Sequence, residues 1–272
     1  MYPSEFSYKR PKTLAEALSL IASDDGAVFM SGGMTLLPAM KHRLQEPSML
    51  IDLRGIADLH GISVEGGVLT IGAATPHAEV ASSDVVKSAI PALAALAGSI
   101  ADPQVRNMGT IGGSIANNDP SADYPSAALG LGATIVTNAR SIPADDFFTG
   151  MFSTALEPGE IVVKVAFPIP ASAGYAKFRS QASRYAMAGS FVAKTGSGVR
   201  VAITGSGNDG VYRWSEAEAA LTAALTETAL DGITASPDDM MEDMHGDAAY
   251  RAALVTRMTR LAVANQGAAH IV

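Results

Sequence analysis

The sequence predicts an α+β protein with more than one domain. Its 272 residues suffice for about two domains of roughly 100–200 residues each. Apolar residues make up 48% of the chain, enough for sizeable buried cores. The N-terminal part alternates strand-like and helix-like segments, the middle carries strands around paired glycines, and the chain ends in helical segments. Elements in this order are typical of α+β folds.

The N-terminal segment has the signals of a βαβ-like unit. Thr13 is a good N-cap for a first helix, and Glu16 completes a capping box. The apolar run Ala27–Met30 predicts a short buried strand. A second helix follows, in which Pro38 fits only within the first turn. The run Met49–Leu53 predicts the closing strand.

The turn Ser31–Thr35 lies between that first strand and the second helix and contains Gly32 and Gly33. In one interpretation the two glycines only make a tight turn. In the other, free N–H groups and the positive end of the helix bind a phosphate or pyrophosphate. Thr35 would then add a hydroxyl.

The segment Leu59–Ala74 alternates apolar and polar residues around Gly66 and Gly67, which predicts a β-hairpin. His77 follows at the start of another helix, where a lone histidine is expected to be a cap or a surface residue. An apolar helix over Pro91–Ala101 then leads into the most distinctive stretch of the chain.

That stretch, Asp102–Pro125, places Gly109, Gly112 and Gly113 among polar side chains, between two apolar runs. Glycine leaves the backbone open to close approach by another group. The stretch is therefore predicted to be a wall that binds a polar ligand through backbone N–H groups, outside the core. Its polar members are Gln104, Arg106, Asn107, Thr110, Asn117, Asn118, Asp119 and Asp123.

The rest of the chain predicts a smaller C-terminal part that begins near Pro168–Ser172. Strands are expected at Gly132–Asn138, Gly159–Pro170 and Ser172–Phe178, and a hairpin at Ser190–Thr204. Helices are expected at Ser215–Ala224 and Asp247–Asn265, with an acidic loop between them.

The segment Gly205–Gly210 formally matches the dinucleotide-binding pattern G-x-G-x-x-G. That motif requires further βα units and an acidic residue about 20 positions later, at a strand end. The remaining sequence shows no second buried strand, so we interpret this segment as a turn.

Composition excludes several classes of function. A net charge of −8 argues against nucleic acid and against anionic membranes as partners. The absence of cysteine excludes disulfides, thiolate catalysis and an iron–sulfur cluster held by this chain's own cysteines. No signal segment or membrane-spanning run is apparent, so we expect a soluble, cytoplasmic protein without stable membrane insertion.

The chain has many candidate binding residues and no evident nucleophile or acid–base pair. The five histidines are scattered, which argues against a metal site. The paired carboxylates lie in turn-like or solvated stretches. This combination suits a protein in which a cofactor carries the chemistry.

Five segments together resemble the FAD-binding medium subunit of molybdenum hydroxylases, the family of aerobic carbon monoxide dehydrogenase and xanthine dehydrogenase. They are SGGMTLLPAMKHRL, IDL, IGAAT, IADPQVRNMGTIGGSIANNDPSADYP and FFTGMFSTALEPGEIV. The resemblance is strong over about residues 1–180 and weaker beyond. The specific signal is the joint occurrence of two glycine motifs at this separation.

The resemblance implies the FAD-binding fold of the vanillyl-alcohol-oxidase (PCMH) type, with two subdomains and a small C-terminal α+β domain. The expected boundaries are residues 1–57, 58–171 and 172–272. The implied partners are a molybdopterin-binding large subunit, which oxidises the substrate, and a [2Fe-2S] small subunit, in a dimer of heterotrimers. Electrons would pass from the clusters to FAD on this chain and then to an external acceptor.

The resemblance also implies which residues bind FAD, and it assigns no catalytic residue or metal ligand to this chain. Pyrophosphate contacts, through backbone N–H groups and the Thr35 hydroxyl, would come from Ser31, Gly32, Gly33, Met34, Thr35 and Leu36. The second cradle would comprise Thr110, Ile111, Gly112, Gly113 and Ser114, with Asn117 beside it. Asp123 would accept hydrogen bonds from FAD hydroxyls, Ile161 would pack near the adenine, and Arg179 and Tyr185 would lie beside the isoalloxazine.

Other interpretations of these residues remain open. Asp123 could instead cap the helix that starts near Pro125, and Tyr185 could be an ordinary core residue. Met34 stands where many relatives have a polar side chain, and Arg184 where the carbon monoxide enzymes tend to have an acid. The alternatives for the whole chain are a stand-alone FAD-dependent oxidoreductase and a non-catalytic scaffold with a vestigial FAD site.

Overall fold

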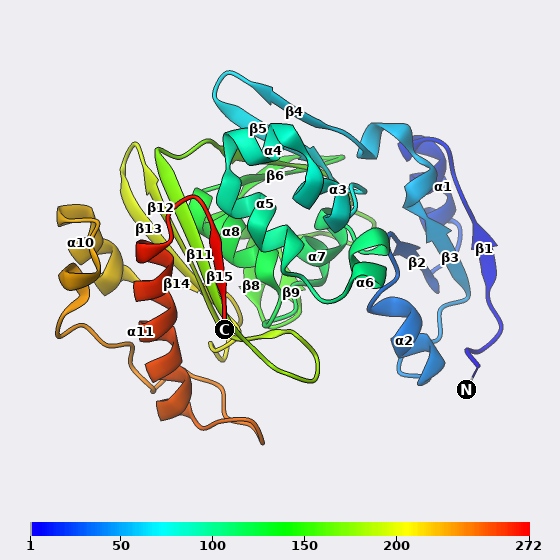
Figure 1. The fold of residues 1–272 in the computed structure, drawn as a ribbon. Coiled ribbons are helices and arrows are strands. Elements are labelled where there is room, and N and C mark those ends of the chain that lie inside the picture. Colours follow the sequence, from blue (N-terminus) through cyan, green and yellow to red (C-terminus); the bar gives the residue numbers. More distant parts are fainter. Residues whose placement is uncertain (1) are drawn as a thin grey trace.

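The structure, a computed structural model, describes residues 2–272 and consists of four β-sheets with helices packed around them (Figure 1). The α+β class predicted from the sequence is confirmed. Across residues 2–272, no helix is both long enough and apolar enough to cross a membrane.

The first sheet is parallel and forms the N-terminal lobe. Its strand order is β1 (Ser7–Lys9), β3 (Met49–Asp52) and β2 (Ala27–Met30). The helices of this lobe are α1 (Leu14–Ala22) and α2 (Leu36–Lys41), followed by the 3-10 helices η1 (Leu53–Gly55) and η2 (Ala57–Leu59). Strand β1 was not predicted, because its three residues are exposed and show no apolar alternation.

The predicted start of α1 is confirmed in detail. The Thr13 hydroxyl accepts the Glu16 N–H at 3.2 Å, and the Glu16 carboxylate accepts the Lys12 N–H at 2.8 Å. Two N–H groups at the helix entrance are thereby satisfied by side chains, which is the role of a capping box. In α2, Pro38 is the third residue, where its missing N–H costs no helical hydrogen bond.

The second sheet is antiparallel and belongs to the middle of the chain. Its order is β4 (Ile62–Glu65), β5 (Val68–Gly72), β10 (Val162–Pro168), β6 (Thr134–Thr137) and β7 (Ser141–Pro143). The predicted hairpin is confirmed: Gly66 and Gly67 join β4 to β5 with φ values of +57° and +78°. Such angles suit the primed turns that match strand twist.

Helices cover this second sheet and carry the glycine-rich stretch. They are α3 (His77–Ser82), α4 (Asp84–Ala89), α5 (Pro91–Gly98), α6 (Pro103–Met108), α7 (Ile111–Asn117), α8 (Asp123–Leu131) and α9 (Ala144–Phe147). A small hairpin of β8 (Phe148–Gly150) and β9 (Ser153–Thr154) follows α9.

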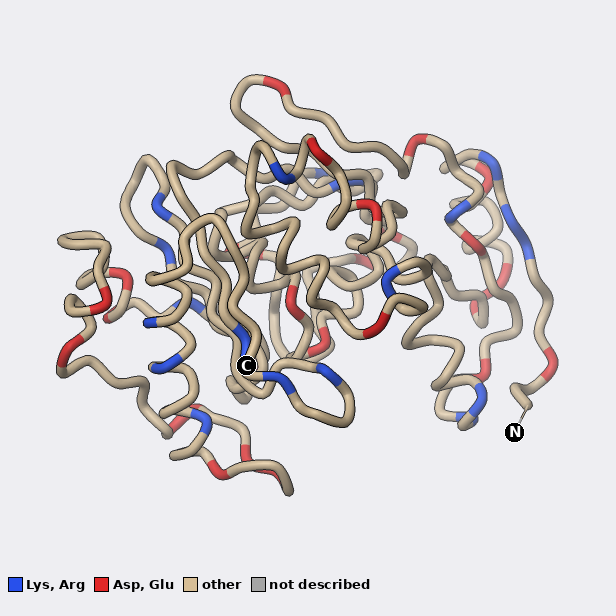
Figure 2. Tube along the Cα trace, viewed as in Figure 1, with Lys and Arg blue, Asp and Glu red and all other residues tan. Residues whose placement is uncertain are grey.

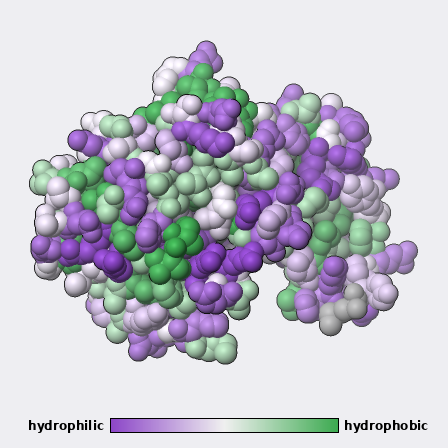
Figure 3. All heavy atoms as spheres, viewed as in Figure 1, coloured by the Kyte–Doolittle hydropathy of each residue, from purple (hydrophilic) through white to green (hydrophobic). Residues whose placement is uncertain are grey.

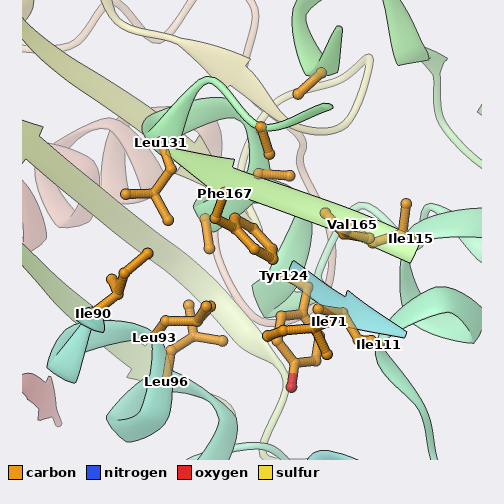
Figure 4. Packing of buried hydrophobic residues seen from close by; sticks show 14 of the residues in the cluster. Ile71, Ile90, Leu93, Leu96, Ile111, Ile115, Tyr124, Leu131, Val165 and Phe167 are labelled. Carbon is orange, nitrogen blue, oxygen red and sulfur yellow. The ribbon is translucent and has the colours of Figure 1, made fainter. Parts of the chain in front are cut away.

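The core of this middle part lies between the sheet and α5, α7 and α8. Figure 4 shows Tyr124 and Ile111 near Ile71, Val165 and Phe167. All five are fully buried. Part of the stretch Asp102–Pro125 is therefore core, contrary to the prediction that it lies outside.

The third sheet forms the C-terminal part of the molecule. Its order is β14 (Tyr212–Arg213), β13 (Gly198–Thr204), β12 (Ala186–Thr195), β11 (Ser172–Arg179) and β15 (Ala269–Ile271). The accompanying helices are α10 (Ser215–Ala223), η3 (Glu227–Leu230) and α11 (Ala248–Ala264). Helix α11 packs on β11 and β12, while α8 of the middle part packs on β12 and β13 (Figure 1).

The segment Gly205–Gly210 is a turn between β13 and β14, as interpreted from the sequence. The Gly205 N–H donates to the Pro120 carbonyl at 2.8 Å, so its backbone is used in packing against the middle part. No helix follows the segment directly, because β14 intervenes.

The predicted domain boundaries, 1–57, 58–171 and 172–272, fall between the three larger sheets. Whether each segment folds as a unit stays a prediction. Lysines and arginines occur in all three parts of the trace, interspersed with acids (Figure 2).

Candidate cofactor-binding site

A cavity of about 750 Å³ lies between the N-terminal lobe, helices α6–α8 and the loop that joins β11 to β12. The space-filling view shows the molecule hollowed between the N-terminal lobe and the remainder (Figure 3). Fourteen of the predicted site residues line it: Ser31, Gly32, Gly33, Met34, Thr35, Leu36, Thr110, Gly112, Gly113, Ser114, Asn117, Asp123, Ile161 and Tyr185. The glycines of Gly205–Gly210 are not among its lining residues.

The first glycine loop offers free backbone donors to this cavity. Among residues 2–272, no protein acceptor lies within hydrogen-bonding range of the N–H groups of Gly32, Gly33, Met34 and Thr35. Gly33 has φ of +72°, a conformation that side chains rarely adopt. The loop leads into α2, and the Thr35 hydroxyl makes no capping bond. It can therefore bind an anion with N–H groups and one hydroxyl.

The second glycine loop differs, because the protein itself uses its N–H groups. The Ile111 N–H donates to the Thr75 carbonyl at 3.2 Å and the Gly112 N–H to the Ala73 carbonyl at 2.8 Å. The Gly113 N–H donates to the Thr110 hydroxyl at 3.2 Å. This loop therefore contributes to the cavity wall mainly through van der Waals contact and the side-chain hydroxyls of Thr110 and Ser114.

The two loops touch. The hydroxyls of Ser31 and Thr110 share a hydrogen bond of 2.9 Å. Gly32 packs so closely that a Cβ there would lie 2.1 Å from the Met108 carbonyl oxygen. Loops 79 residues apart in the chain thus form one continuous wall.

Most glycines of the second motif make room for protein rather than for a ligand. A Cβ at Gly109 would lie 2.6 Å from His77 Nε2, and one at Gly112 would lie 2.4 Å from the Ala73 Cβ. Gly113 is less crowded, with Thr110 Oγ1 at 3.0 Å as its nearest neighbour. Gly109 and Gly112 are therefore packing residues that also line the cavity, and the contact of Gly112 with a ligand stays a prediction.

Asp123 begins α8 and is 4% exposed. Its carboxylate accepts a hydrogen bond from the Tyr175 hydroxyl and forms an ion pair with Lys177 at 2.9 Å. The alternative that Asp123 caps the helix is wrong, because Ala122 is the N-cap and makes no side-chain bond. Nearby Asp119 also lines the cavity, and its burial raises the pKa of its carboxyl.

A short turn after α5 forms another wall. The Arg106 guanidinium donates to the carbonyls of Ile100 and Ala101 at 2.8 and 3.1 Å, and Arg184 donates to Ala101 at 3.3 Å. Ala101 has φ of +41°, which is uncommon outside glycine. Two cations therefore hold a strained turn whose residues face the cavity.

Tyr185 lies at the rim of the cavity and is 45% exposed, so it is not an ordinary core residue. It follows Arg184, whose φ is +64°. Partial burial, together with the charges of Asp119 and Asp123, raises the pKa of the Tyr185 hydroxyl. The hydroxyl therefore stays protonated and can donate a hydrogen bond.

The prediction that His77 is a cap or a surface residue is wrong. His77 is 5% exposed, lines the cavity, and its ring centroid lies 5.3 Å from that of Tyr124. Burial and the charge of Arg106 lower the pKa of His77 to about 4. The imidazole is therefore neutral near pH 7. The signal that could have revealed it is the apolar hairpin immediately before it, which leads into the core.

The cavity is also lined by Ile161, whose N–H donates to the Asn138 side chain at 2.7 Å. Its neighbour Glu160 also lines the cavity and accepts hydrogen bonds from Arg140. These bonds lower the pKa of Glu160 to about 2. Hydrogen bonds thus fix Glu160 and Ile161, the two residues immediately before β10.

Two predicted site residues lie elsewhere. Ile111 is fully buried in the core, and Arg179, at the end of β11, is not among the lining residues. The cavity is also lined by Asp102, Val105 and Asp119 of the predicted wall, and by Ile100, Ala101 and Glu160, which sequence reasoning missed.

The arrangement is suited to binding an elongated molecule with an anionic centre. Free N–H groups lie at one wall, carboxylates at another, and an aromatic ring at the rim. The ionised carboxylates are paired or hydrogen-bonded, and the single lining histidine is neutral. The cavity walls therefore favour binding over acid–base chemistry by the protein itself.

Comparison with known proteins gives consistent matches over nearly the whole chain. Residues 4–170 match the family described as FAD binding domain in molybdopterin dehydrogenase. The carbon monoxide dehydrogenase medium chain of Hydrogenophaga pseudoflava is 35% identical over 97% of both chains. The nicotine 6-hydroxylase medium subunit of Paenarthrobacter nicotinovorans is 32% identical over 96% of this chain and 97% of its own. The solved carbon monoxide dehydrogenase of Oligotropha carboxidovorans matches with a TM-score of 0.89 and 35% identity, over 98% of this chain and 99% of that one.

Proposed function

Because the chain belongs to the FAD-binding medium subunits of molybdenum hydroxylases, we propose that it is the electron-transfer flavoprotein subunit of such a hydroxylase. Its α+β structure is the PCMH-type FAD-binding fold of that family. The chain is accordingly part of an oxidoreductase that uses FAD. Bound FAD would accept electrons from iron–sulfur clusters and pass them to an external acceptor.

The residues of the cavity fit FAD. The free N–H groups of Gly32–Thr35 suit a pyrophosphate, because its oxygens are anionic and accept hydrogen bonds. Asp123 suits hydroxyl groups of the cofactor, Ile161 an apolar contact near the adenine, and Tyr185 a flavin face. A cavity of about 750 Å³ is in the size range of cofactor sites.

The proposal includes two partner chains. A large subunit would bind molybdopterin and oxidise the substrate, and a small subunit would carry the [2Fe-2S] clusters, for which this chain has no cysteine ligands. Two such heterotrimers would form the dimer, in the cytoplasm. The names of the relatives as medium chains support a complex of several subunits.

One observation carries the proposal: the Ser31–Thr110 hydrogen bond joins the two glycine loops into one wall with unused N–H groups. Four neighbouring N–H groups without a protein acceptor at the entrance of a helix are the arrangement that binds an anion, which supports a working site over a vestigial one. A stand-alone oxidase would need an acid–base group above the flavin, and the cavity offers no evident pair.

Flavin binding and electron transfer can be tested separately. We expect the purified full chain, titrated with FAD, to bind one FAD per chain and to quench the fluorescence of the flavin. After anaerobic mixing with the chemically reduced [2Fe-2S] subunit, the visible absorbance of the oxidised flavin should bleach. FAD binding without bleaching would contradict the electron-transfer role, and no FAD binding would contradict the site.

A further inference from the structure

Lys177 is a fully buried lysine in β11 of the C-terminal sheet and contacts Asp123, a residue that lines the cavity. Its ammonium lies 2.9 Å from Asp123 Oδ1, 3.1 Å from Asp123 Oδ2 and 3.3 Å from the Ser99 carbonyl oxygen. A buried ammonium is costly unless it is paired and hydrogen-bonded. Here its polar partners are Asp123, which lines the cavity, and Ser99, which immediately precedes the lining residue Ile100.

Tyr175 approaches the same carboxylate from the same strand. Residues two apart in a strand point to one face, so the side chains of Tyr175 and Lys177 emerge together. The Tyr175 hydroxyl donates to Asp123 Oδ1. Gly189, which pairs with Lys177 in the neighbouring strand, leaves the space for it: a Cβ at Gly189 would lie 2.7 Å from the Tyr175 oxygen.

These contacts leave Asp123 with acceptor capacity for a ligand. A carboxylate offers about four acceptor positions on its two oxygens. Tyr175 and Lys177 occupy two on Oδ1 and one on Oδ2. A position on Oδ2 remains for a hydroxyl or N–H donor in the cavity that Asp123 lines.

The same ammonium also fixes a second wall. The Ser99 carbonyl precedes the cavity-lining turn at Ile100 and Ala101. Lys177, from a strand of the C-terminal part, therefore connects the start of α8 to the end of α5. Neither α5 nor α8 contains a lysine or arginine of its own.

We propose that Lys177, assisted by Tyr175, is a positioning residue for cofactor binding, which holds the Asp123 carboxylate aimed at FAD. The C-terminal sheet thereby completes a site whose glycine loops both lie in the first 170 residues. This inference rests on the proposed function, since it requires FAD in the cavity.

The test is a double-mutant cycle on the full chain, with the FAD dissociation constant as the readout. Lys177→Met keeps a long apolar stem and leaves Asp123 without its counter-charge. We expect it to weaken FAD binding about tenfold or more, the range for loss of a bond to a charged group. Asp123→Asn should also weaken binding, because the amide is a poorer acceptor for hydroxyl donors.

The double variant Lys177→Met/Asp123→Asn decides the point. If Lys177 acts through Asp123, adding Lys177→Met to Asp123→Asn should change the dissociation constant less than about twofold. Equal weakening by Lys177→Met in both backgrounds would overturn the proposal. So would unchanged FAD binding in Lys177→Met while Asp123→Asn weakens it.

Two controls separate this role from general stability. Lys194→Met removes an exposed lysine from the adjacent strand β12 and should leave FAD binding unchanged. Each variant is titrated at a temperature where circular dichroism shows it to be folded; a lower melting temperature with a wild-type dissociation constant would mean a structural role only and would overturn the proposal. Failure of the wild-type chain to bind FAD would instead contradict the proposed function.

Discussion

At the residue scale, glycines at the site serve close backbone contact more than ligand contact. Gly32 has the Met108 carbonyl oxygen 2.1 Å from where its Cβ would stand, and Gly112 has Ala73 in the same role. The sequence could predict that glycine is needed at these positions. It could not predict what approaches, because the approaching atoms come from segments distant in the chain.

The first prediction concerns the junction of the two loops. Gly32→Ala should displace the first loop from Met108 and raise the FAD dissociation constant by about 5- to 150-fold, since overpacking of this kind costs about 1–3 kcal/mol. Flavin content after purification and the FAD dissociation constant measure it. Gly196→Ala is the matched control, because nothing lies within 4 Å of that position; equal flavin content in both variants would contradict the account.

The second prediction concerns His77 and pH. The pKa of His77 in the folded chain, about 4, lies below the ordinary value of 6.5. Between these two pH values the imidazole is protonated in the unfolded chain and neutral in the folded chain. Stability from this group is therefore present above about pH 6.5 and falls as the pH drops toward 4. The loss is about 1.4 kcal/mol per pH unit, or about 2 kcal/mol at about pH 5.

Urea unfolding near pH 7 and near pH 5 measures this effect. The variant His77→Phe retains a buried ring without the ionisable group. It should lose about 2 kcal/mol less stability than the wild type between these two pH values. The same loss in both proteins would show that His77 is not held neutral by the fold.

At the element scale, the regular strands were predictable and helices α6 and α7 were not. The strand Ala27–Met30 and the hairpin around Gly66 were predicted from apolar runs and turn residues, and both are confirmed. Helices α6 and α7 have six and seven residues, too short for an apolar period to show. Their starts depend on side-chain caps at Asp102 and Thr110, which accept N–H bonds three residues ahead.

The third prediction concerns the contact between β11 and α11. A Cβ at Gly174 would lie 2.1 Å from the Ala262 carbonyl oxygen, so Gly174→Ala should force the helix away from the sheet. We expect the free energy of unfolding to fall by about 1–3 kcal/mol, as measured by chemical denaturation. Gly98→Ala, at the exposed end of α5 with its nearest neighbour at 3.7 Å, should be neutral or stabilising.

At the scale of the whole molecule, the order of the three sheets follows the order of the chain, and this much was predictable from the sequence. The pairing of Lys177 with Asp123 was not, because the two residues are 54 positions apart and lie on separate elements. The same holds for the contact of Ser31 with Thr110. The walls of the cavity thus come from local motifs, while their assembly depends on contacts that no local pattern reveals.

The measurement that tests the central claim most directly is the composition of what this chain binds in its own cell. The full chain, tagged and purified under gentle conditions, should carry FAD and bring with it a large chain containing molybdopterin and a small chain containing iron–sulfur clusters. Visible absorption, metal analysis and mass spectrometry of the same sample report all three. Recovery of the chain alone and without flavin would contradict the account.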